Sequence, residues 1–244
     1  MSALDALTWC IGLALLSLFL VSYINDRQAK RRLVKRKVEN MKRRIVELEE
    51  ICALIEPLIE NNAIIHAVVS ELIALIGRTR DLDPASHYLD TNLATAEERL
   101  RNLQHPDAPI GLWRVLGSDA AIARARFALN ECGRIVRKLQ QRGEINPAEM
   151  ELYINELAWS HLMVGVITLV SQGHKTVNNG DVLKGFAFYK NAQQVLTQSN
   201  HPDERKHQFI KELGEILNGQ RKAISPSLMP ETDYNPSEIK MQRA

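Results

Sequence analysis

Cysteines and catalytic motifs are both scarce in this chain of 244 residues. Its three cysteines, Cys10, Cys52 and Cys132, stand far apart and form no C-x-x-C pair, so the sequence predicts neither a disulfide framework nor a zinc site. His201 and His207 are six residues apart and do not share a helical face, which predicts a solvated helix start. The chain also lacks a Walker loop, a dinucleotide fingerprint, an H-E-x-x-H motif and a G-x-S-x-G motif. We therefore predict no catalytic residue, no cofactor and no metal site.

Charge is missing from residues 6–25, and the only charged residue before them is Asp5. A helix of about 20 apolar residues, rising about 1.5 Å per residue, spans a hydrocarbon core about 30 Å thick. Trp9 and Tyr23 stand near its two ends, where interfacial aromatic residues are common. A secretory signal peptide carries its basic residues before the apolar run and a cleavage site after it, which is the reverse of this pattern. Residues 6–25 are therefore predicted to be an uncleaved transmembrane helix, in preference to a buried core helix.

Basic residues follow this apolar run closely. Residues 27–44 hold ten of the 31 lysines and arginines, with only Glu39 against them. The positive-inside rule places residues 1–5 outside and everything after the anchor in the cytoplasm. We expect a bacterial inner membrane, although a mitochondrial membrane fits the sequence as well. Seven of these residues are predicted to fix the topology and to contact anionic lipid head groups: Arg27, Lys30, Arg31, Arg32, Lys35, Arg36 and Lys37.

Residues 26–57 form a basic helical stem in which apolar residues recur at alternating spacings of four and three. Such a heptad seam lies along one side of a helix. Two interpretations stay open, since the seam can join a second copy in a parallel homodimer or pack onto the chain's own helices. Pro57 interrupts the pattern. The candidate dimer seam is Val38, Met41, Ile45, Leu48, Cys52 and Ile55.

The remainder reads as a cytoplasmic helical bundle of about six helices over residues 58–219, because no segment carries a convincing strand pattern. Ser118 or Asp119 is predicted to cap one helix, and Asn146 with Pro147 to begin the next. That next helix, residues 147–177, is the most apolar of this part and is predicted to be central to the core.

Two stretches carry weaker expectations. A connector at residues 111–117 makes Trp113 a candidate for burial. Residues 220–244 contain three prolines and few large apolar residues, which predicts a disordered tail.

Residues 173–192 carry small residues at spacings typical of two tightly packed helices. They resemble the centre of a tetratricopeptide repeat, a 34-residue helix–turn–helix, in a hairpin over about residues 169–198. Thr176 replaces the usual aromatic and Thr197 the closing proline, and any tight antiparallel hairpin would use a similar pattern. The resemblance implies a groove that binds peptides or proteins. The residues that match are Gly173, Gly180, Asp181, Gly185, Tyr189 and Ala192.

These observations predict a single-pass membrane-anchored adaptor, without enzymatic activity, that docks partner proteins at the cytoplasmic membrane face. A second interpretation is a ligand binder or enzyme with a pocket between residues 147–177 and their neighbours. A third is a nucleic-acid tether through residues 27–44. We do not expect the third, since those residues lack the interleaved aromatic side chains that stack on bases.

Overall fold

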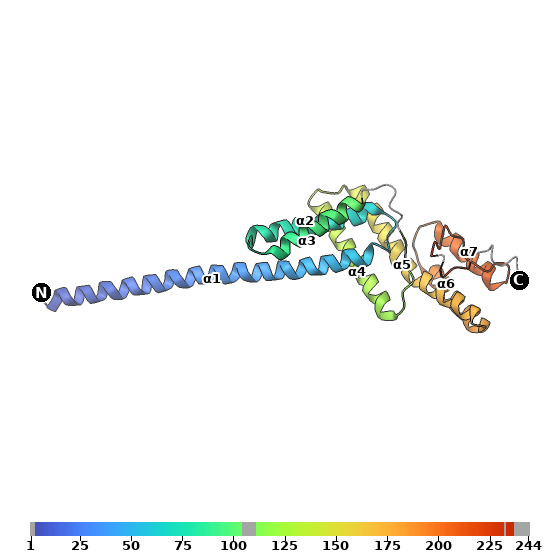
Figure 1. The fold of residues 1–244 in the computed structure, drawn as a ribbon, viewed down its shortest axis with the longest axis horizontal. Coiled ribbons are helices and arrows are strands. Elements are labelled where there is room, and N and C mark those ends of the chain that lie inside the picture. Colours follow the sequence, from blue (N-terminus) through green and yellow to red (C-terminus); the bar gives the residue numbers. More distant parts are fainter. Residues whose placement is uncertain (1–2, 104–110, 232, 237–244) are drawn as a thin grey trace.

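The computed structural model of the protein describes residues 3–103, 111–231 and 233–236, with side chains described from Ser17 onward apart from residues 20 and 21. The described residues contain seven helices and no strand, which confirms the predicted all-α class. Figure 1 shows one long helix whose first part projects from a bundle and whose second part belongs to that bundle. The helices are α1 (Ala3–Ile55), α2 (Asn62–Leu82), α3 (His87–Leu103), α4 (Asp119–Gln141), α5 (Pro147–Asn178), α6 (Val182–Gln198) and α7 (Arg205–Leu217).

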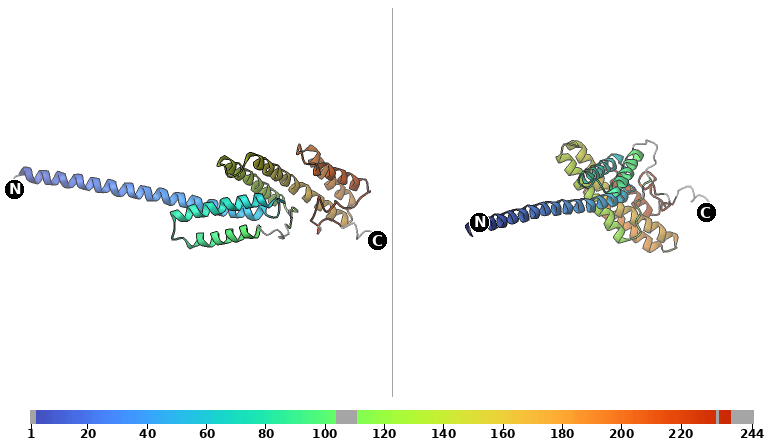
Figure 2. Two further views of the ribbon diagram at one scale, coloured as in Figure 1. Left: turned by 90° about the horizontal axis from the view of Figure 1, so that it is seen from above. Right: turned by 60° about the vertical axis from the view of Figure 1, so that its left-hand side comes forward.

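Helix α1 runs without a break for 53 residues, from the predicted anchor into the stem. It contains no proline and ends at Ile55, two residues before Pro57, where the ring would clash with the preceding turn. The side chains of residues 6–16, 20 and 21 of the predicted membrane helix lie outside the described residues. Figure 2 shows from two further directions that the first part of α1 stands clear of the bundle.

The other helices begin where local capping chemistry places them. Ser118 accepts a hydrogen bond from the amide of Ala121 and so caps α4. Asn146 accepts from the amide of Glu149, whose carboxylate accepts from the amide of Asn146 in return, which makes a capping box for α5. Both predicted starts are confirmed.

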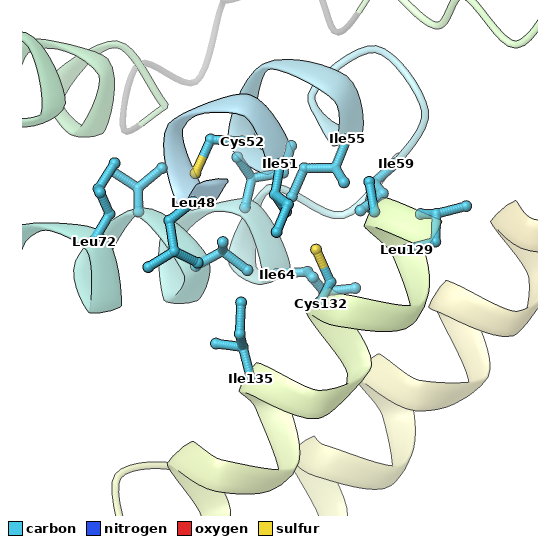
Figure 3. Close-up of a cluster of buried hydrophobic side chains, with 14 of the residues drawn as sticks. Leu48, Ile51, Cys52, Ile55, Ile59, Ile64, Leu72, Leu129, Cys132 and Ile135 are labelled. Carbon is cyan, nitrogen blue, oxygen red and sulfur yellow. The ribbon is translucent and has the colours of Figure 1, made fainter. Parts of the chain in front are cut away.

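The side chains form two apolar cores that α5 joins. The first core lies between the second half of α1, α2, α3, α4 and the start of α5 (Figure 3). The second lies between the rest of α5, α6, α7 and the segment after α7. Met163, Val166, Ile167 and Val170 of α5 are fully buried there, so this helix is central to the core as predicted. The predicted ligand pocket between residues 147–177 and their neighbours stays a prediction: core side chains pack around the middle of α5, while a cavity of about 490 Å³ lies beside its start, where Glu149 and Tyr153 line it together with residues of α2.

The heptad seam of the stem packs within the chain itself. Ile45, Leu48, Cys52 and Ile55 are all buried in the first core, against α2 and α4. Figure 3 labels the last three of them. Val38, at 6% exposure, marks the point where burial begins, and Met41 is half-buried. A homodimer through the buried side chains would have to pull α1 away from its own bundle, so the structure favours the intramolecular interpretation.

The prediction of a disordered tail is wrong for the part that the structure describes. Ile224, Leu228 and Met229 are buried in the second core. Glu231 is 3% exposed and forms an ion pair with Arg114, 2.7 Å from its Nε. The apolar residues there are few, but the pairing with a residue 117 positions earlier fixes the segment. Residues 232 and 237–244 of the predicted tail lie outside the described residues.

The expectation for the connector before α4 is also corrected. Trp113 is 44% exposed, with its ring centroid 5.3 Å from that of Tyr234, while the neighbouring Arg114 is the buried residue. An arginine can be buried there because Glu231 supplies a negative charge and accepts hydrogen bonds from Nε and Nη2, and the carbonyl of Leu228 accepts a further one.

Two of the described helices, α2 and α5, are long and apolar enough to cross a membrane by length and composition alone. About half of the apolar window of each is buried inside the bundle (44% for α2 and 56% for α5). Core helices of a folded domain have the same composition, and α2 lines the first core described above while α5 lines both.

Candidate functional site: a charged cleft beside the stem

The first part of the stem is fully exposed. Every residue from 22 to 37 is exposed, and these include all seven basic residues predicted to face the lipid: Arg27, Lys30, Arg31, Arg32, Lys35, Arg36 and Lys37. The apolar Leu33 and Val34 are exposed in the same stretch, at 64% and 46%. This part of α1 is therefore a free rod that carries positive charge.

The bundle meets this rod at the end of α2. Lys42 of α1 donates a hydrogen bond of 2.8 Å to the carboxylate of Asp83, directly after α2. This hydrogen bond raises the pKa of Lys42, so the lysine stays charged. The contact ties the loop between α2 and α3 to the stem just beyond Val38.

A cleft of about 600 Å³ opens beside this junction, between α1, α2 and α4. Its floor is apolar: Leu48 and Ile135 are buried, and Met41 and Leu75 are half-buried. The charged side chains that line it are Lys37, Arg44, Arg78, Arg134 and Lys138, and against them Glu71, Asp81 and Glu131. Positive charges therefore exceed negative ones by five to three around an apolar floor.

Glu71 is the first of two buried carboxylates in the cleft. It is 7% exposed, and Arg142 donates to it at 2.6 Å, with Arg78 at 3.5 Å and Lys138 at 3.8 Å. Burial alone would raise the pKa of Glu71, but the hydrogen bond from Arg142 and the three positive charges together lower it. The carboxylate is therefore ionised at neutral pH and holds α2 to the end of α4.

Glu131 is the second buried carboxylate, at 6% exposure. It accepts from Arg44 of α1 at 3.3 Å and from Arg134 one turn along α4. The guanidinium group of Arg44 thus joins the stem to α4, while the side chain of Arg134 is 73% exposed and points its remaining donors outward. The basic side chains that pair with these two carboxylates surround the floor of the cleft as a ring of cations. The outer ends of these side chains face solvent.

The residues that suggested a docking hairpin are mostly interior. Tyr189 is 2% exposed and Ala192 fully buried. A Cβ on Gly173 would lie 2.3 Å from the ring of Tyr189, and one on Gly185 2.3 Å from Val177. These residues let α5 and α6 approach closely, so they cannot line a groove on the surface.

The turn of the same hairpin is exposed and serves local structure. Gly180 has φ +91, a backbone angle that favours glycine, and Asp181 caps α6 by accepting from the amide of Lys184. The predicted helix–turn–helix is present, and four of its six predicted binding residues are buried between the helices, while Gly180 and Asp181 are exposed at the turn.

Burial keeps one histidine and two cysteines of the described residues uncharged. Burial lowers the pKa of His174 to about 4, and its Nδ1 shares a hydrogen bond of 2.8 Å with the hydroxyl of Tyr189. Burial raises the pKa of Cys52 to about 11 and that of Cys132 further, so both thiols stay protonated. Among the described residues, no group of three or more histidines, cysteines or carboxylates could hold a metal ion.

In comparisons with known proteins, no family model matches this chain, and no curated protein or solved structure matches it either. The resemblance of residues 173–192 to a tetratricopeptide repeat therefore stays a prediction.

Sequence reasoning missed the cleft, because its parts come from three helices far apart in the chain. One signal was present. Glu71 falls between Val69 and Leu72 on the apolar face of α2, and Glu131 stands beside Cys132 on that of α4. A carboxylate on a buried face needs a cation, and that requirement points to a paired site.

Proposed function

We propose that this protein is a single-pass membrane-anchored adaptor that docks a partner protein at the cytoplasmic face. In this proposal residues 6–25 cross a membrane, preferably a bacterial inner membrane, with residues 1–5 outside. The observation that carries it is the exposed rod of residues 22–37, which connects an uncharged segment to a folded bundle and in which every residue is exposed.

The dimensions of α1 support a role as a spacer. Val38, where the bundle begins, is 13 residues beyond Asn25, or about 20 Å along the helix at about 1.5 Å per residue. The seven basic residues lie in that interval, where each near the surface contributes about 1 kcal/mol of attraction to anionic lipid. A spacer of this kind keeps the bundle near the membrane and leaves its surface free for a soluble or membrane-bound partner.

The cleft between α1, α2 and α4 supports docking more than catalysis. It is open, its buried carboxylates are neutralised by arginines, and its floor is apolar. Apolar surface ringed by charge is typical of protein interaction sites.

The test uses the full chain in native membranes, with a photoreactive amino acid placed at Leu82 on the cleft or at Leu183 on α6. Both side chains are exposed, at 38% and 86%, so Leu183 is the matched control. We expect a discrete protein adduct from Leu82 and none from Leu183. A chain truncated to residues 1–37 gives the background of the anchor alone. Adducts no stronger than this background at both sites would contradict the proposal.

A second arm tests the anchor itself. Arginine at the centre of a membrane helix costs about 2.5–3.5 kcal/mol on insertion scales, so Leu15→Arg together with Leu16→Arg should release the protein into the alkaline carbonate supernatant. Leu33→Arg on the exposed rod should leave it in the pellet. Release of the wild-type protein by carbonate would contradict the proposal that residues 6–25 anchor it in a membrane.

A further inference from the structure

The chemistry around the cleft indicates what kind of partner segment it takes, if the docking function proposed above holds. We propose that the cleft between α1, α2 and α4 receives an acidic amphipathic helix of the partner protein, with the helix's apolar stripe on the floor and its carboxylates on the ring of cations.

The floor fits the apolar stripe of a helix. Met41 and Leu48 lie two turns apart on α1, while Leu75 comes from α2 and Ile135 from α4. Helix-in-groove recognition uses apolar residues at i, i+3, i+4 and i+7, which lie on one face of the incoming helix. Such a helix would pack between α2 and α4 beside the stem, as one more member of the bundle.

The basic side chains around the floor suit an incoming helix that carries acidic residues on both sides of its apolar stripe. The side chains of Arg78, Arg134 and Lys138 are 52%, 73% and 63% exposed although each pairs with a buried carboxylate. Glu71 and Glu131 each have several cations around them and so cannot neutralise them all. Arginine and lysine donors that still face solvent are suited to carboxylates from outside.

The distance from the membrane argues against lipid head groups as the occupant. Arg44 is 19 residues beyond Asn25, or about 28 Å along the helix at about 1.5 Å per residue. Electrostatic attraction to a lipid surface decays within a Debye length of about 8 Å at physiological salt. The part of the cleft around Arg44 is therefore beyond the reach of the lipids that the first part of the stem meets, and only Lys37 at its edge belongs to both.

The lining of the cleft argues against nucleic acid. None of the described residues that line it is aromatic, so bases have no stacking surface there. A phosphate backbone would also pass close to the carboxylates of Glu71, Asp81 and Glu131. An acidic helix can place its few carboxylates to avoid these groups, whereas a uniform chain of phosphates cannot.

The experiment measures binding of a labelled synthetic peptide to the full-length protein in nanodiscs of neutral phosphatidylcholine, by fluorescence anisotropy. The probe has about 18 residues, enough to hold a helix, with leucine at i, i+3, i+4 and i+7 and glutamate on both flanks. One control peptide has the same composition in scrambled order, and another has lysine in place of glutamate. A single-stranded oligonucleotide of similar charge is the fourth probe.

Two double variants on the same helix separate the cleft from general charge. Arg134→Gln with Lys138→Gln removes two cations from the cleft, and Arg124→Gln with Arg137→Gln removes two exposed cations outside it. Because removing a cation that pairs with a bound carboxylate weakens affinity strongly, we expect about tenfold weaker binding of the acidic peptide by the first variant and less than about twofold by the second. Thermal unfolding of each variant shows that it is folded. Leu75→Glu places a charge on the apolar floor of the cleft and should abolish binding of the acidic peptide.

Equal binding of the acidic and scrambled peptides, or equal loss in both double variants, would overturn the proposal. So would tighter binding of the oligonucleotide with the same dependence on Arg134 and Lys138, which would assign the cleft to nucleic acid. If Leu82 forms protein adducts in native membranes but the acidic peptide does not bind, docking stands and the chemistry proposed for the partner is wrong. If the adducts are absent, the proposed function itself fails.

Discussion

Every residue from 22 to 37 of α1 is exposed, whereas from Val38 onward the same helix turns a buried stripe toward α2 and α4. Both parts are helical, but the first carries seven lysines and arginines, whereas residues 38–55 carry three of them and four glutamates. The surroundings of the two parts differ as well. In the second part, carboxylates from other helices meet the cations and apolar side chains cover the seam. One uninterrupted helix can therefore serve as a free spacer at one end and as a core element at the other.

The largest expected effect on stability comes from a substitution in the buried seam of α1, where the second part of the helix differs from the first. Ile45→Ala removes a fully buried side chain from the first core and should lower the free energy of unfolding by about 2–5 kcal/mol. Val34→Ala, three turns earlier and 46% exposed, should change it by less than about 0.5 kcal/mol. Urea unfolding of the full chain in detergent, followed by tryptophan fluorescence, gives both values. Similar losses for the two variants would mean that the first part of α1 is also packed.

A smaller effect on stability is expected from alanine at two glycine positions on other helices, one tightly packed and one open. Gly173→Ala would place a Cβ 2.3 Å from the buried ring of Tyr189, and overpacking of this kind costs about 1–3 kcal/mol. Gly77→Ala meets no atom within 4 Å, so the better helix propensity of alanine should stabilise the protein by about 0.5–1 kcal/mol. Thermal unfolding should move in opposite directions for these two substitutions. A stabilising Gly173→Ala would show that α5 and α6 are not in close contact there.

The smallest effect concerns the charges at the cleft, and it depends on pH. The pKa of Glu71 is lower in the folded protein than in the unfolded chain, so its ion pairs stabilise the fold above the unfolded pKa, about 4.3 for glutamate. That stability is lost as the pH falls through the folded pKa. Between pH 7 and 3 the free energy of unfolding should therefore fall more for the wild-type protein than for Glu71→Gln. Parallel curves for the two proteins would show that Arg142 does not hold the carboxylate in its ionised form.

Local signals in the sequence predicted the helices well. Ser118 and Asn146 mark their helix starts because a cap needs only the three or four residues around it. The sequence also predicts the turn at Gly180 and Asp181, and the central place of α5. The seam of α1 was recognised as apolar, but periodicity could not decide between a second copy and the chain's own helices.

The parts that the sequence could not predict depend on partners far along the chain. The buried pair of Arg114 and Glu231 spans 117 positions, and without it residues 220–236 read as polar and disordered. The cleft has the same origin, since Glu71 and Arg142 are 71 positions apart. Small residues at 173 and 185 did predict a close helix contact, but close contact removes a surface and does not create a binding groove.

The most direct test of the proposed architecture is sided labelling of two cysteines in intact cells, in a Cys10→Ser background. Cys52 and Cys132 are buried, which keeps the background low. The proposal predicts that Ser2→Cys reacts with a membrane-impermeant maleimide from outside, whereas Leu183→Cys reacts only after the membrane is opened. Labelling of both cysteines from the same side would contradict an α1 that crosses the membrane once and carries the bundle in the cytoplasm.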